Sequence, residues 1–348
     1  MKPGKLDVRK PSLGAFMDSF DIDTRQLPLR SALDFWQESA GSLYDVHIFQ
    51  PEEFYTTHRT FQFGELLLTR CSSVSQRLSR SSYRICADSH ELFEVQFYLA
   101  GHWSRQDGRR EAEAGQGDIV IQDTAQPHAG SATAFTNVTL FVPRRALTPF
   151  LNRPDEQNMR VLPSAAPMAR LLHAHVDNLW RTLPLLNEPQ AAALSRPTVE
   201  LIAAVLNGTP REDAAQGVME AQLEEIRRYV RAHILDKDLS PVRIALTFGI
   251  SARKLAYLFS SDGGVASYIQ RLRLGLAHQS LRDRAQAHKT VADIGLEHGF
   301  VYAQNFTRAF QRQHGLTPRE VRAIAQKNWM ARANEPQSWF DRAFRWGR

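Results

Sequence analysis

The sequence has little cysteine and no long apolar run. Cys71 and Cys86 are the two cysteines among 348 residues, too few for a disulfide framework or for a zinc site made of four thiolates. We therefore expect two ordinary thiols in a reducing compartment. No stretch of 18 uninterrupted apolar residues occurs, and residues 1–10 are charged without an apolar segment behind them. Neither a membrane span nor export is predicted, and the expected location is cytoplasmic.

Most of the chain lacks an excess of positive charge, and the excess that exists lies at the C-terminal end. Residues 219–326 carry 16 Lys and Arg against 10 Asp and Glu, and residues 327–348 carry five against two. The first 218 residues have a net charge of −3. A basic segment joined to a mildly acidic one indicates that only the C-terminal part meets a polyanion. A solvated helical surface could carry the same charge, so this signal is supporting evidence.

The last third of the chain contains two similar helix-turn-helix patterns, about 50 residues apart. The apolar residues and glycines of the first pattern are Ile244, Leu246, Gly249, Leu255, Phe259, Gly264 and Val265, and those of the second are Ile294, Leu296, Gly299, Phe306, Phe310, Gly315 and Leu316. The offset grows by one residue after the glycine of the turn, where an extra residue is tolerated. Two such units in tandem suit the placement of two helices in successive turns of a DNA major groove.

The first half of the chain is predicted to be rich in β-strands. Alternating, β-branched and aromatic residues fall in segments separated by Gly, Ser, Asp and Pro, namely Phe61 to Thr69, Leu92 to Leu99, Gly117 to Gln122 and Phe135 to Val142. Residues 92–99 place Phe93, Val95 and Phe97 on one face and Glu94 and Gln96 on the other, the pattern of a half-buried strand. Such strands without long helices between them favour an antiparallel barrel or jelly roll.

Helical periodicity begins at Met168 and returns after Pro197. This helical pair could close the barrel domain, form a two-fold interface, or simply pack on the core. The polar segment that follows contains Gly and Pro without an apolar period, as a linker does. The resulting fold class is α+β, with a β-barrel or jelly roll and accessory helices before an all-α domain of two helix-turn-helix units. The expected divisions are residues 1–206, a linker at 207–218, the helical domain at 219–326 and a basic-aromatic tail at 327–348.

The helical domain is expected to open with an amphipathic helix from about Glu220 to Ile234. Ser240 and Ser251 are expected to cap the next two helices, and Gly249 to make the turn between them. With the apolar residues inward, the outward residues at the start of each second helix are donors, acceptors and cations. In the first unit they are Arg253, Lys254, Ala256 and Tyr257, and in the second Gln304, Asn305, Arg308 and Arg312. Side chains of these kinds read base edges and phosphates.

The connection between the units reads as one helix from Val265 to Asp283, roughly 28 Å long at about 1.5 Å per residue. Adjacent major-groove segments on one face of DNA lie about 34 to 36 Å apart. A stiff spacer of this length can hold two recognition helices near that separation, whereas a flexible linker would lose affinity to entropy. We therefore expect one protomer to read a two-part site.

Residues 220–326 resemble the DNA-binding domain of the AraC/XylS family of bacterial transcription regulators. The carrying residues are Ala245, Gly249, Ile250 and Ser251, the run YIQRLRLGLAHQSL, and VADIGLEHGF followed by NFTRAFQRQHGLTP. The resemblance implies that base-facing positions are occupied by Arg253, Ala256, Tyr257, Gln304, Asn305 and Arg308. With their neighbours, the expected DNA-binding set also includes Ser251, Lys254, Ala303 and Arg312. Promoter DNA, RNA polymerase and a second copy of the chain are the partners that this implies, with activation as the expected outcome.

Three features depart from the family pattern. Gly295 stands where Ala is common, which lowers helix propensity by up to about 1 kcal/mol. Val301 and Tyr302 stand where a small polar pair is usual, so an N-cap worth about 1 kcal/mol is missing. The tail after Gln326 places four aromatic residues among four arginines, and it docks either on the protein, which we favour, or on DNA. The aromatic residues are Trp339, Phe340, Phe344 and Trp346.

The segment GQGDIVIQDTAQPH resembles a strand-turn-strand signature of the cupin-like effector domains found in such regulators. The resemblance implies a small-molecule effector, for which the candidate contacts are Phe93, Val95, Phe97 and His128. The first three fit a pocket or a core equally well. His90 and His102 are further candidate contacts, but no His-x-His pair accompanies them, so neither a metal site nor a cofactor is expected.

Other classes of function were weighed against a ligand-responsive regulator. A DNA-alkylation repair enzyme with a similar domain uses a four-cysteine zinc site and an acceptor thiol, which two cysteines do not supply. A cupin-type enzyme fused to a DNA-binding domain lacks its metal-ligand motif here. No enzymatic activity is therefore expected. A constitutive regulator whose barrel is only structural or oligomeric stays open.

Overall fold

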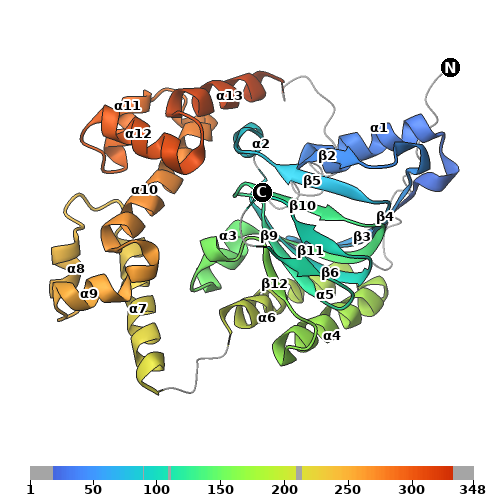
Figure 1. Ribbon diagram of the computed structural model, residues 1–348, viewed down its shortest axis with the longest axis horizontal. Helices are drawn as coiled ribbons and strands as arrows, with labels where there is room; N and C mark the ends of the chain where they lie inside the picture. Colours follow the sequence, from blue (N-terminus) through green and yellow to red (C-terminus); the bar gives the residue numbers. More distant parts are fainter. Residues whose placement is uncertain (1–18, 89, 109–110, 209–213, 332–348) are drawn as a thin grey trace. The chain divides into compact units, whose positions relative to one another are not determined.

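The computed structural model describes residues 19–88, 90–108, 111–208 and 214–331. These residues form two compact units, one up to residue 208 and one from residue 214, which are described separately. The first unit is built mainly of β-strands and the second of helices (Figure 1). The α+β fold class predicted from the sequence is confirmed.

The first unit contains a seven-stranded antiparallel sheet. Its strands, in spatial order, are β1 (Ser19–Asp23), β3 (Thr56–Phe63), β4 (Leu66–Ser73), β11 (Phe135–Pro143), β6 (Leu92–Ala100), β9 (Ile119–Asp123) and β12 (Arg160–Leu162). Strand β6 lies between β11 and β9, near the middle of the sheet, and is paired with both. Strands of 8 or 9 residues at β3, β4, β6 and β11 form the broadest part of the layer.

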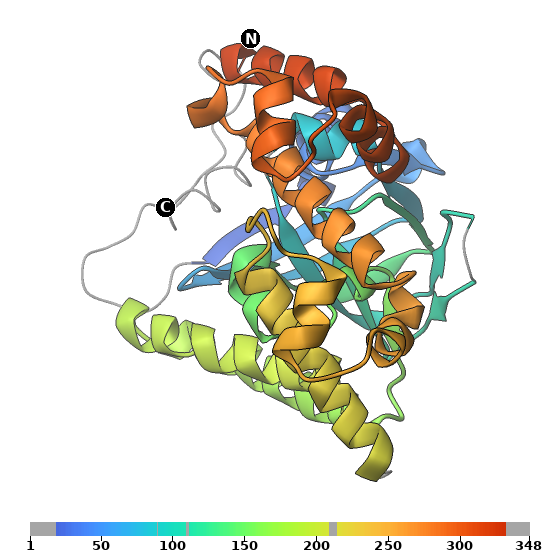
Figure 2. The same cartoon turned by 90° about the vertical axis from the view of Figure 1, so that its left-hand side faces the viewer.

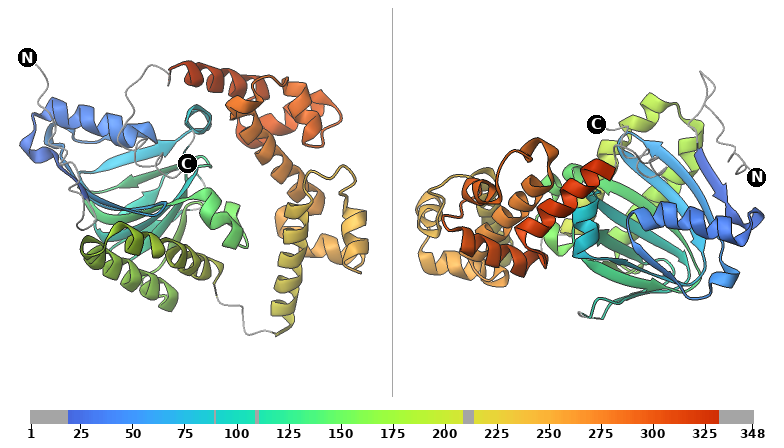
Figure 3. Two further views of the ribbon diagram at one scale, coloured as in Figure 1. Left: turned by 180° about the vertical axis from the view of Figure 1, so that it is seen from behind. Right: turned by 90° about the horizontal axis from the view of Figure 1, so that it is seen from above.

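A second, five-stranded sheet faces the first (Figure 3). Its strands, in spatial order, are β2 (Asp45–Ile48), β5 (Gln76–Arg80), β10 (His128–Ala132), β7 (Trp103–Arg105) and β8 (Glu113–Ala114). The part of the chain that the structure describes contains no ladder joining the two sheets. The predicted barrel is therefore corrected to two packed antiparallel sheets, the open form of a jelly roll, in which the edges stay unpaired.

Strand β6 also differs from its prediction as a half-buried strand. Phe93, Val95 and Phe97 are buried as expected, but Glu94 and Gln96 on the opposite face are buried as well. The reason is that each face of the seven-stranded sheet is covered by another layer. The alternating polar residues Glu94 and Gln96 therefore face a polar interior between the layers and not solvent.

The predicted strand from Phe61 to Thr69 is in fact a hairpin. Strand β3 ends at Phe63, Gly64 and Glu65 form the turn, and β4 begins at Leu66. Gly64 has a φ of +58°, a left-handed conformation that glycine adopts without the strain that a Cβ would add. Gly64 was the one residue in this otherwise strand-like sequence that indicated the turn.

Helices cover the outer face of the seven-stranded sheet. They are α4 (Pro167–Thr182), α5 (Glu188–Ala193) and α6 (Ser195–Asn207) (Figure 1). Leu172 and Val176 of α4 and Ile202 of α6 belong to one core cluster with Phe93 and Val95. Of the alternatives for this helical pair, core packing is what the structure shows. Helix α1 (Leu29–Ser39) contributes Trp36 to a separate core between the two sheets.

The second unit begins with α7 (Ala214–Ala232), followed by α8 (Pro241–Thr247) and α9 (Ala252–Leu258). The predicted caps are confirmed: Ser240 and Ser251 accept hydrogen bonds from the backbone N–H of Arg243 and Lys254. Gly249 turns the chain with a φ of +59°. The apolar residues of α7, α8 and α9 pack with the first half of α10 (Val265–Arg282) into one core. Helix α7 begins inside the predicted linker, which leaves a shorter connection to α6.

The second half of α10 packs against α11 (Val291–Glu297), α12 (Ala303–His314) and α13 (Pro318–Ala331) (Figure 2). Phe306 and Phe310 are fully buried, and their rings lie 5.5 Å apart. Tyr302 precedes α12 without a side-chain cap, as the sequence predicted. Trp339, Phe340, Phe344 and Trp346 of the tail lie outside the described residues. Over the described ranges, no helix combines the length and the apolar character that crossing a membrane requires.

Candidate DNA-binding surface and internal cavity

Helix α9 presents its predicted outward residues to solvent. Ser251, Arg253, Lys254, Ala256 and Tyr257 are all exposed, and the Tyr257 side chain keeps 65% of its full exposure. Leu255 and Leu258 are buried beneath them. The helix is therefore anchored by one face and offers a polar and aromatic opposite face.

Helix α12 has the same division of its two faces. Ala303, Gln304, Asn305, Arg308 and Arg312 are exposed, and the buried face holds the two phenylalanines. Val301 and Tyr302, just before the helix, are also exposed, at 76% and 69%. Their apolar surface extends the exposed face of α12 toward its N-terminus.

The cations of these two faces form no ion pair with the described residues of the protein. Among the described residues, no ion pair involves Arg253, Lys254, Arg308 or Arg312. Elsewhere in the unit, by contrast, the buried Arg227 guanidinium lies 2.6 Å from the Asp262 carboxylate, which Arg271 also contacts at 2.7 Å. Exposed cations without an ion-pair partner on a helix face suit contacts with phosphates and base edges.

The first unit contains a cavity of about 90 Å³ between its two sheets and α1. This is room for several water molecules or for a small ligand. The lining comes from α1 and the following turn, from β3, β4, β6 and β11 of one sheet, and from β5 of the other. The lining residues are Trp36, Ser39, Ala40, Leu43, Tyr44, His58, Thr69, Cys71, Gln76, Leu78, Glu94, Gln96, Phe135, Asn137, Thr139 and Phe141.

Glu94 is the buried carboxylate of this cavity, with 2% exposure. Its Oε1 accepts a hydrogen bond of 2.6 Å from the Tyr44 hydroxyl, and its Oε2 accepts one of 2.9 Å from Nε2 of Gln96. Burial raises the pKa of Glu94, and the two hydrogen bonds oppose that rise because they favour the charged form. Sequence reasoning assigned Glu94 and Gln96 to a solvent face, and the signal that it missed was their position inside a strongly apolar strand.

Several buried polar atoms of the lining have no hydrogen-bond partner in the described part of the protein: Nδ1 of His58, Nε2 of Gln76 and Oδ1 of Asn137. Unpaired buried polar atoms cost free energy, so they are rare unless a ligand or water completes them. The pKa of His58 falls to about 4 because burial disfavours the imidazolium. Burial likewise raises the pKa of the neighbouring Cys71 thiol to about 12, so this thiol is protonated and unreactive at neutral pH.

Three of the four residues predicted to contact an effector lie away from this cavity. Phe93, Val95 and Phe97 point from β6 into the core beneath α4 and α6, on the face opposite to Glu94. The strand alternation placed them correctly on one face, but which face meets the cavity depends on the second sheet. Gln76 and Asn137, which do line it, carried no distinctive signal in the sequence.

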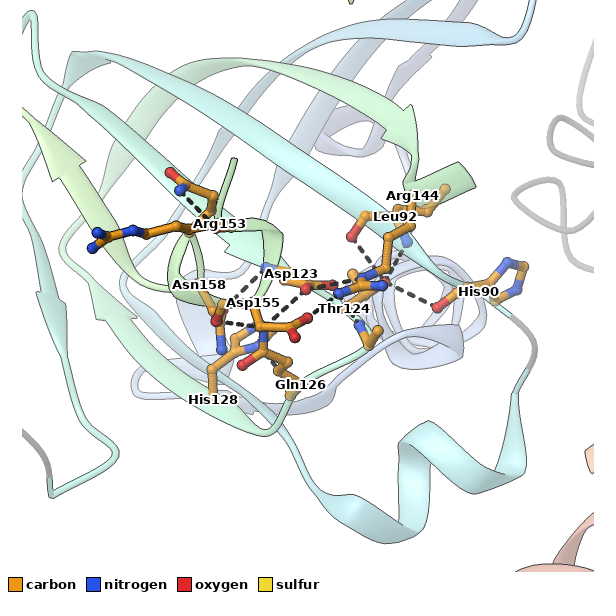
Figure 4. Close-up of polar contacts among 12 residues, drawn as sticks. His90, Leu92, Asp123, Thr124, Gln126, His128, Arg144, Arg153, Asp155 and Asn158 are labelled. Atoms are coloured by element: carbon orange, nitrogen blue, oxygen red, sulfur yellow. Dashed lines mark hydrogen bonds and ion pairs between the residues drawn. The ribbon is translucent and has the colours of Figure 1, made fainter. Parts of the chain in front are cut away.

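His128 sits beside the cavity rather than in its lining. Its Nδ1 lies 2.9 Å from the carbonyl oxygen of Gln126, and its ring packs edge-on against Tyr44 at 5.7 Å. Burial lowers the pKa of His128 to about 4. Figure 4 shows its surroundings, where Asp123 accepts hydrogen bonds from Gln126 and Arg144. These contacts fix the turn between β9 and β10 to the start of α3 (Arg144–Leu147).

The other candidate histidines lie apart from His128. His90 is buried, and its backbone carbonyl accepts a hydrogen bond from Thr124, whereas His102 is largely exposed beside Glu113. No group of three or more His, Cys, Asp or Glu within the described ranges is arranged to hold a metal ion.

Two protein families match the chain in the order of the two units. Residues 44–207 match the AraC-binding-like domain, and residues 244–324 match a helix-turn-helix domain. The transcriptional activator NphR of Rhodococcus sp is 25% identical over 314 residues, which cover 85% of this chain and 90% of that protein. The crystal structure of the AraC-like transcriptional activator CuxR superposes with a TM-score of 0.51 at 24% identity, covering 75% of this chain and 95% of that one.

The relatives are transcription regulators, and the two matched domains account for the sheet-rich unit and for the paired helix-turn-helix unit. The chain belongs to the AraC type of transcriptional regulators, with an effector-binding domain followed by a DNA-binding domain.

Proposed function

We propose that this protein activates transcription by binding promoter DNA at two successive major-groove segments, one through α9 and one through α12. The observation that carries the proposal is the repeated exposure of a polar helix face above a buried apolar one. Both faces belong to one unit and share α10, so a single protomer can offer both helices. Activation is proposed because the relatives described above are named activators.

The side chains divide by the chemistry that each can perform. Arg253, Arg308 and Arg312 can donate to guanine or to phosphates, and Lys254 serves as a point charge for phosphate. Gln304 and Asn305 can make the paired hydrogen bonds that adenine accepts and donates. The exposed ring of Tyr257 and the methyl group of Ala256 suit contact with thymine methyls, while Ser251 and Ala303 lie where the backbone approaches DNA.

The first unit is proposed to bind a small-molecule effector in its internal cavity and to change DNA binding or activation. Its unpartnered polar atoms support this role. RNA polymerase and a second copy of the chain are the other proposed partners. Because promoter DNA lies in the bacterial cytoplasm, the proposed location of the protein is cytoplasmic. No catalytic step is proposed.

A footprint of the full-length protein on promoter DNA tests the two-segment arrangement. Two protected major-groove segments one helical turn apart are expected. Replacing both Arg253 and Tyr257 by alanine should weaken protection of one segment, while Arg308→Ala weakens the other. Protection of a single segment, or equal loss from both variants at both segments, would contradict it.

Mapping of bound sites in cells with and without candidate metabolites tests the effector role. Occupancy or transcript output should change with one metabolite and lose that response when the cavity is altered. A regulator that binds and activates identically under all conditions would be constitutive, with the sheet-rich unit serving structure or oligomerisation alone.

A further inference from the structure

The charge inside the cavity limits what can occupy it. None of the sixteen residues that line it is Lys or Arg, and Glu94 is the carboxylate among them. The nearby Arg80 is committed elsewhere: its two terminal nitrogens each lie 2.7 Å from an Asp88 oxygen, and it also donates to backbone carbonyls. A buried anion entering the cavity would therefore lie beside the Glu94 carboxyl group without a free cation to balance its charge.

The hydrogen-bonding capacity of the lining points to the polar group of the occupant. The indole Nε1 of Trp36 can only donate, and it lies 2.8 Å from Oε1 of Gln76. This contact fixes the Gln76 amide, so its unpartnered Nε2 is a donor that needs an acceptor. Oδ1 of Asn137 is an acceptor that needs a donor. The Glu94 carboxylate has further accepting capacity beyond its two hydrogen bonds.

The rest of the lining is apolar and aromatic. Trp36, Phe135 and Phe141 supply rings, and Leu43 and Leu78 supply aliphatic surface. The aromatic faces can pack on a flat apolar body and can also stabilise a cation. They cannot compensate for a negative charge.

We infer that the effector cavity takes a small apolar molecule that bears an O–H or N–H donor and no negative charge, and that it rejects carboxylates. This rests on the proposed function of the cavity as the effector site. The donor of the ligand faces Glu94 and Asn137, an accepting atom beside it satisfies Gln76, and the apolar body lies against the aromatic rings. Cationic and neutral ligands share this chemistry.

A matched series of probes tests the inference on the purified full-length protein. Three apolar bodies, benzyl, cyclohexylmethyl and n-pentyl, are each presented as the alcohol, the ammonium and the carboxylate. Binding is measured by titration calorimetry at pH 7. For the bodies that bind, the alcohol or the ammonium should have a Kd at least tenfold lower than the matching carboxylate.

Glu94→Gln isolates the cause of that discrimination, because it removes the ionisable carboxyl group and keeps the shape. The advantage over the carboxylate should shrink at least fivefold. Glu113→Gln, at an exposed site on β8, is the control and should leave the ranking unchanged. Should Glu94→Gln fail to fold, the wild-type ranking decides by itself.

The possible failures are separable. If a carboxylate binds as tightly as its alcohol and ammonium partners, or if discrimination survives unchanged in Glu94→Gln, the ligand class is wrong while the cavity stands as an effector site. If none of the nine probes binds at millimolar concentration, the inference fails together with the effector role of the cavity. In that case the DNA-binding part of the proposed function is untouched.

Discussion

Arg273 of α10 packs against Gly299, the glycine of the turn between α11 and α12. The Arg273 guanidinium also donates hydrogen bonds of 2.9 Å to the carbonyl oxygens of Ile234 and Asp236, just after α7. A Cβ at Gly299 would lie 2.7 Å from Nη1 of Arg273. One side chain of the shared helix therefore contacts both the segment after α7 and the turn before α12.

Gly299→Ala should destabilise the second unit more than Gly249→Ala does. Both glycines have positive φ, +82° and +59°, so alanine is strained at each by about 1 kcal/mol. Only Gly299 has Arg273 in the space of the new methyl group, since nothing lies within 4 Å at Gly249. We expect Gly299→Ala to cost about 1 to 2 kcal/mol more in the free energy of unfolding, measured in urea. Equal losses of stability in the two variants would show that the Arg273 side chain moves aside without cost.

Gly295→Ala should destabilise the protein although alanine is the better helix former. A Cβ at Gly295 would lie 2.9 Å from the Phe306 ring, so the core must shift at a cost of roughly 1 to 3 kcal/mol. Gly275→Ala in α10 is the matched control, because nothing lies within 4 Å of its added methyl group. That variant should gain about 1 kcal/mol. A gain of similar size at Gly295 would contradict the packing argument. Phe306→Leu, which replaces the ring by a smaller aliphatic side chain, should reduce the cost of Gly295→Ala in a double-mutant cycle.

Arg308→Ala should weaken binding by about 1 to 3 kcal/mol and relax specificity at one base pair, if Arg308 reads a base. The measurement is affinity across a set of single-base variants of the site at several salt concentrations. An equal loss on every sequence, with a reduced salt dependence, would assign Arg308 to a phosphate. Arg170→Ala, an exposed arginine of α4 in the other unit, removes the same charge and should change neither specificity nor affinity.

Acid should destabilise the second unit through two stacked histidines. His278 and His314 lie 4.6 Å apart beside Phe310. Burial lowers the pKa of His314 to about 4 and that of His278 well below its usual value. Below about pH 6.5 the unfolded chain takes up protons that the folded chain refuses, so stability falls as pH decreases toward 4. The slope is at most about 1.4 kcal/mol per pH unit for each histidine.

Hydrogen exchange of α12 and α13 in the full-length protein, followed from pH 7 to pH 5 and corrected for intrinsic rates, measures this loss. His314→Gln should reduce the pH dependence by about one proton. His288→Gln, at an exposed position of the same unit, should leave it unchanged. A pH dependence that is the same in both variants would assign the effect to other groups.

Much of the helical unit could be predicted from the sequence because its signals are local. Ser240 and Ser251 cap the helices that follow them, and the 3.6-residue period separates buried Leu255 and Phe306 from exposed Arg253 and Arg308. Caps and apolar periodicity act over one or two helical turns, so they can be read without knowing the neighbouring elements. Whether the exposed residues contact DNA stays a prediction.

In the sheet-rich unit, strand alternation assigned residues to faces, but the tertiary structure decided what each face meets. Along β6 the sequence separates Phe93 from Glu94. Only the packing of α4 on one side and of the second sheet on the other turns Phe93 into core and Glu94 into a cavity wall. The same holds for Arg273 and Gly299, which lie 26 positions apart. Local sequence determines the conformation of a segment and which residues share a face. Which face is buried, which lines a cavity and which distant residues come into contact depend on the layer that packs against the segment. The physical reason is that the free energy of burial comes from surfaces that only the complete fold brings together.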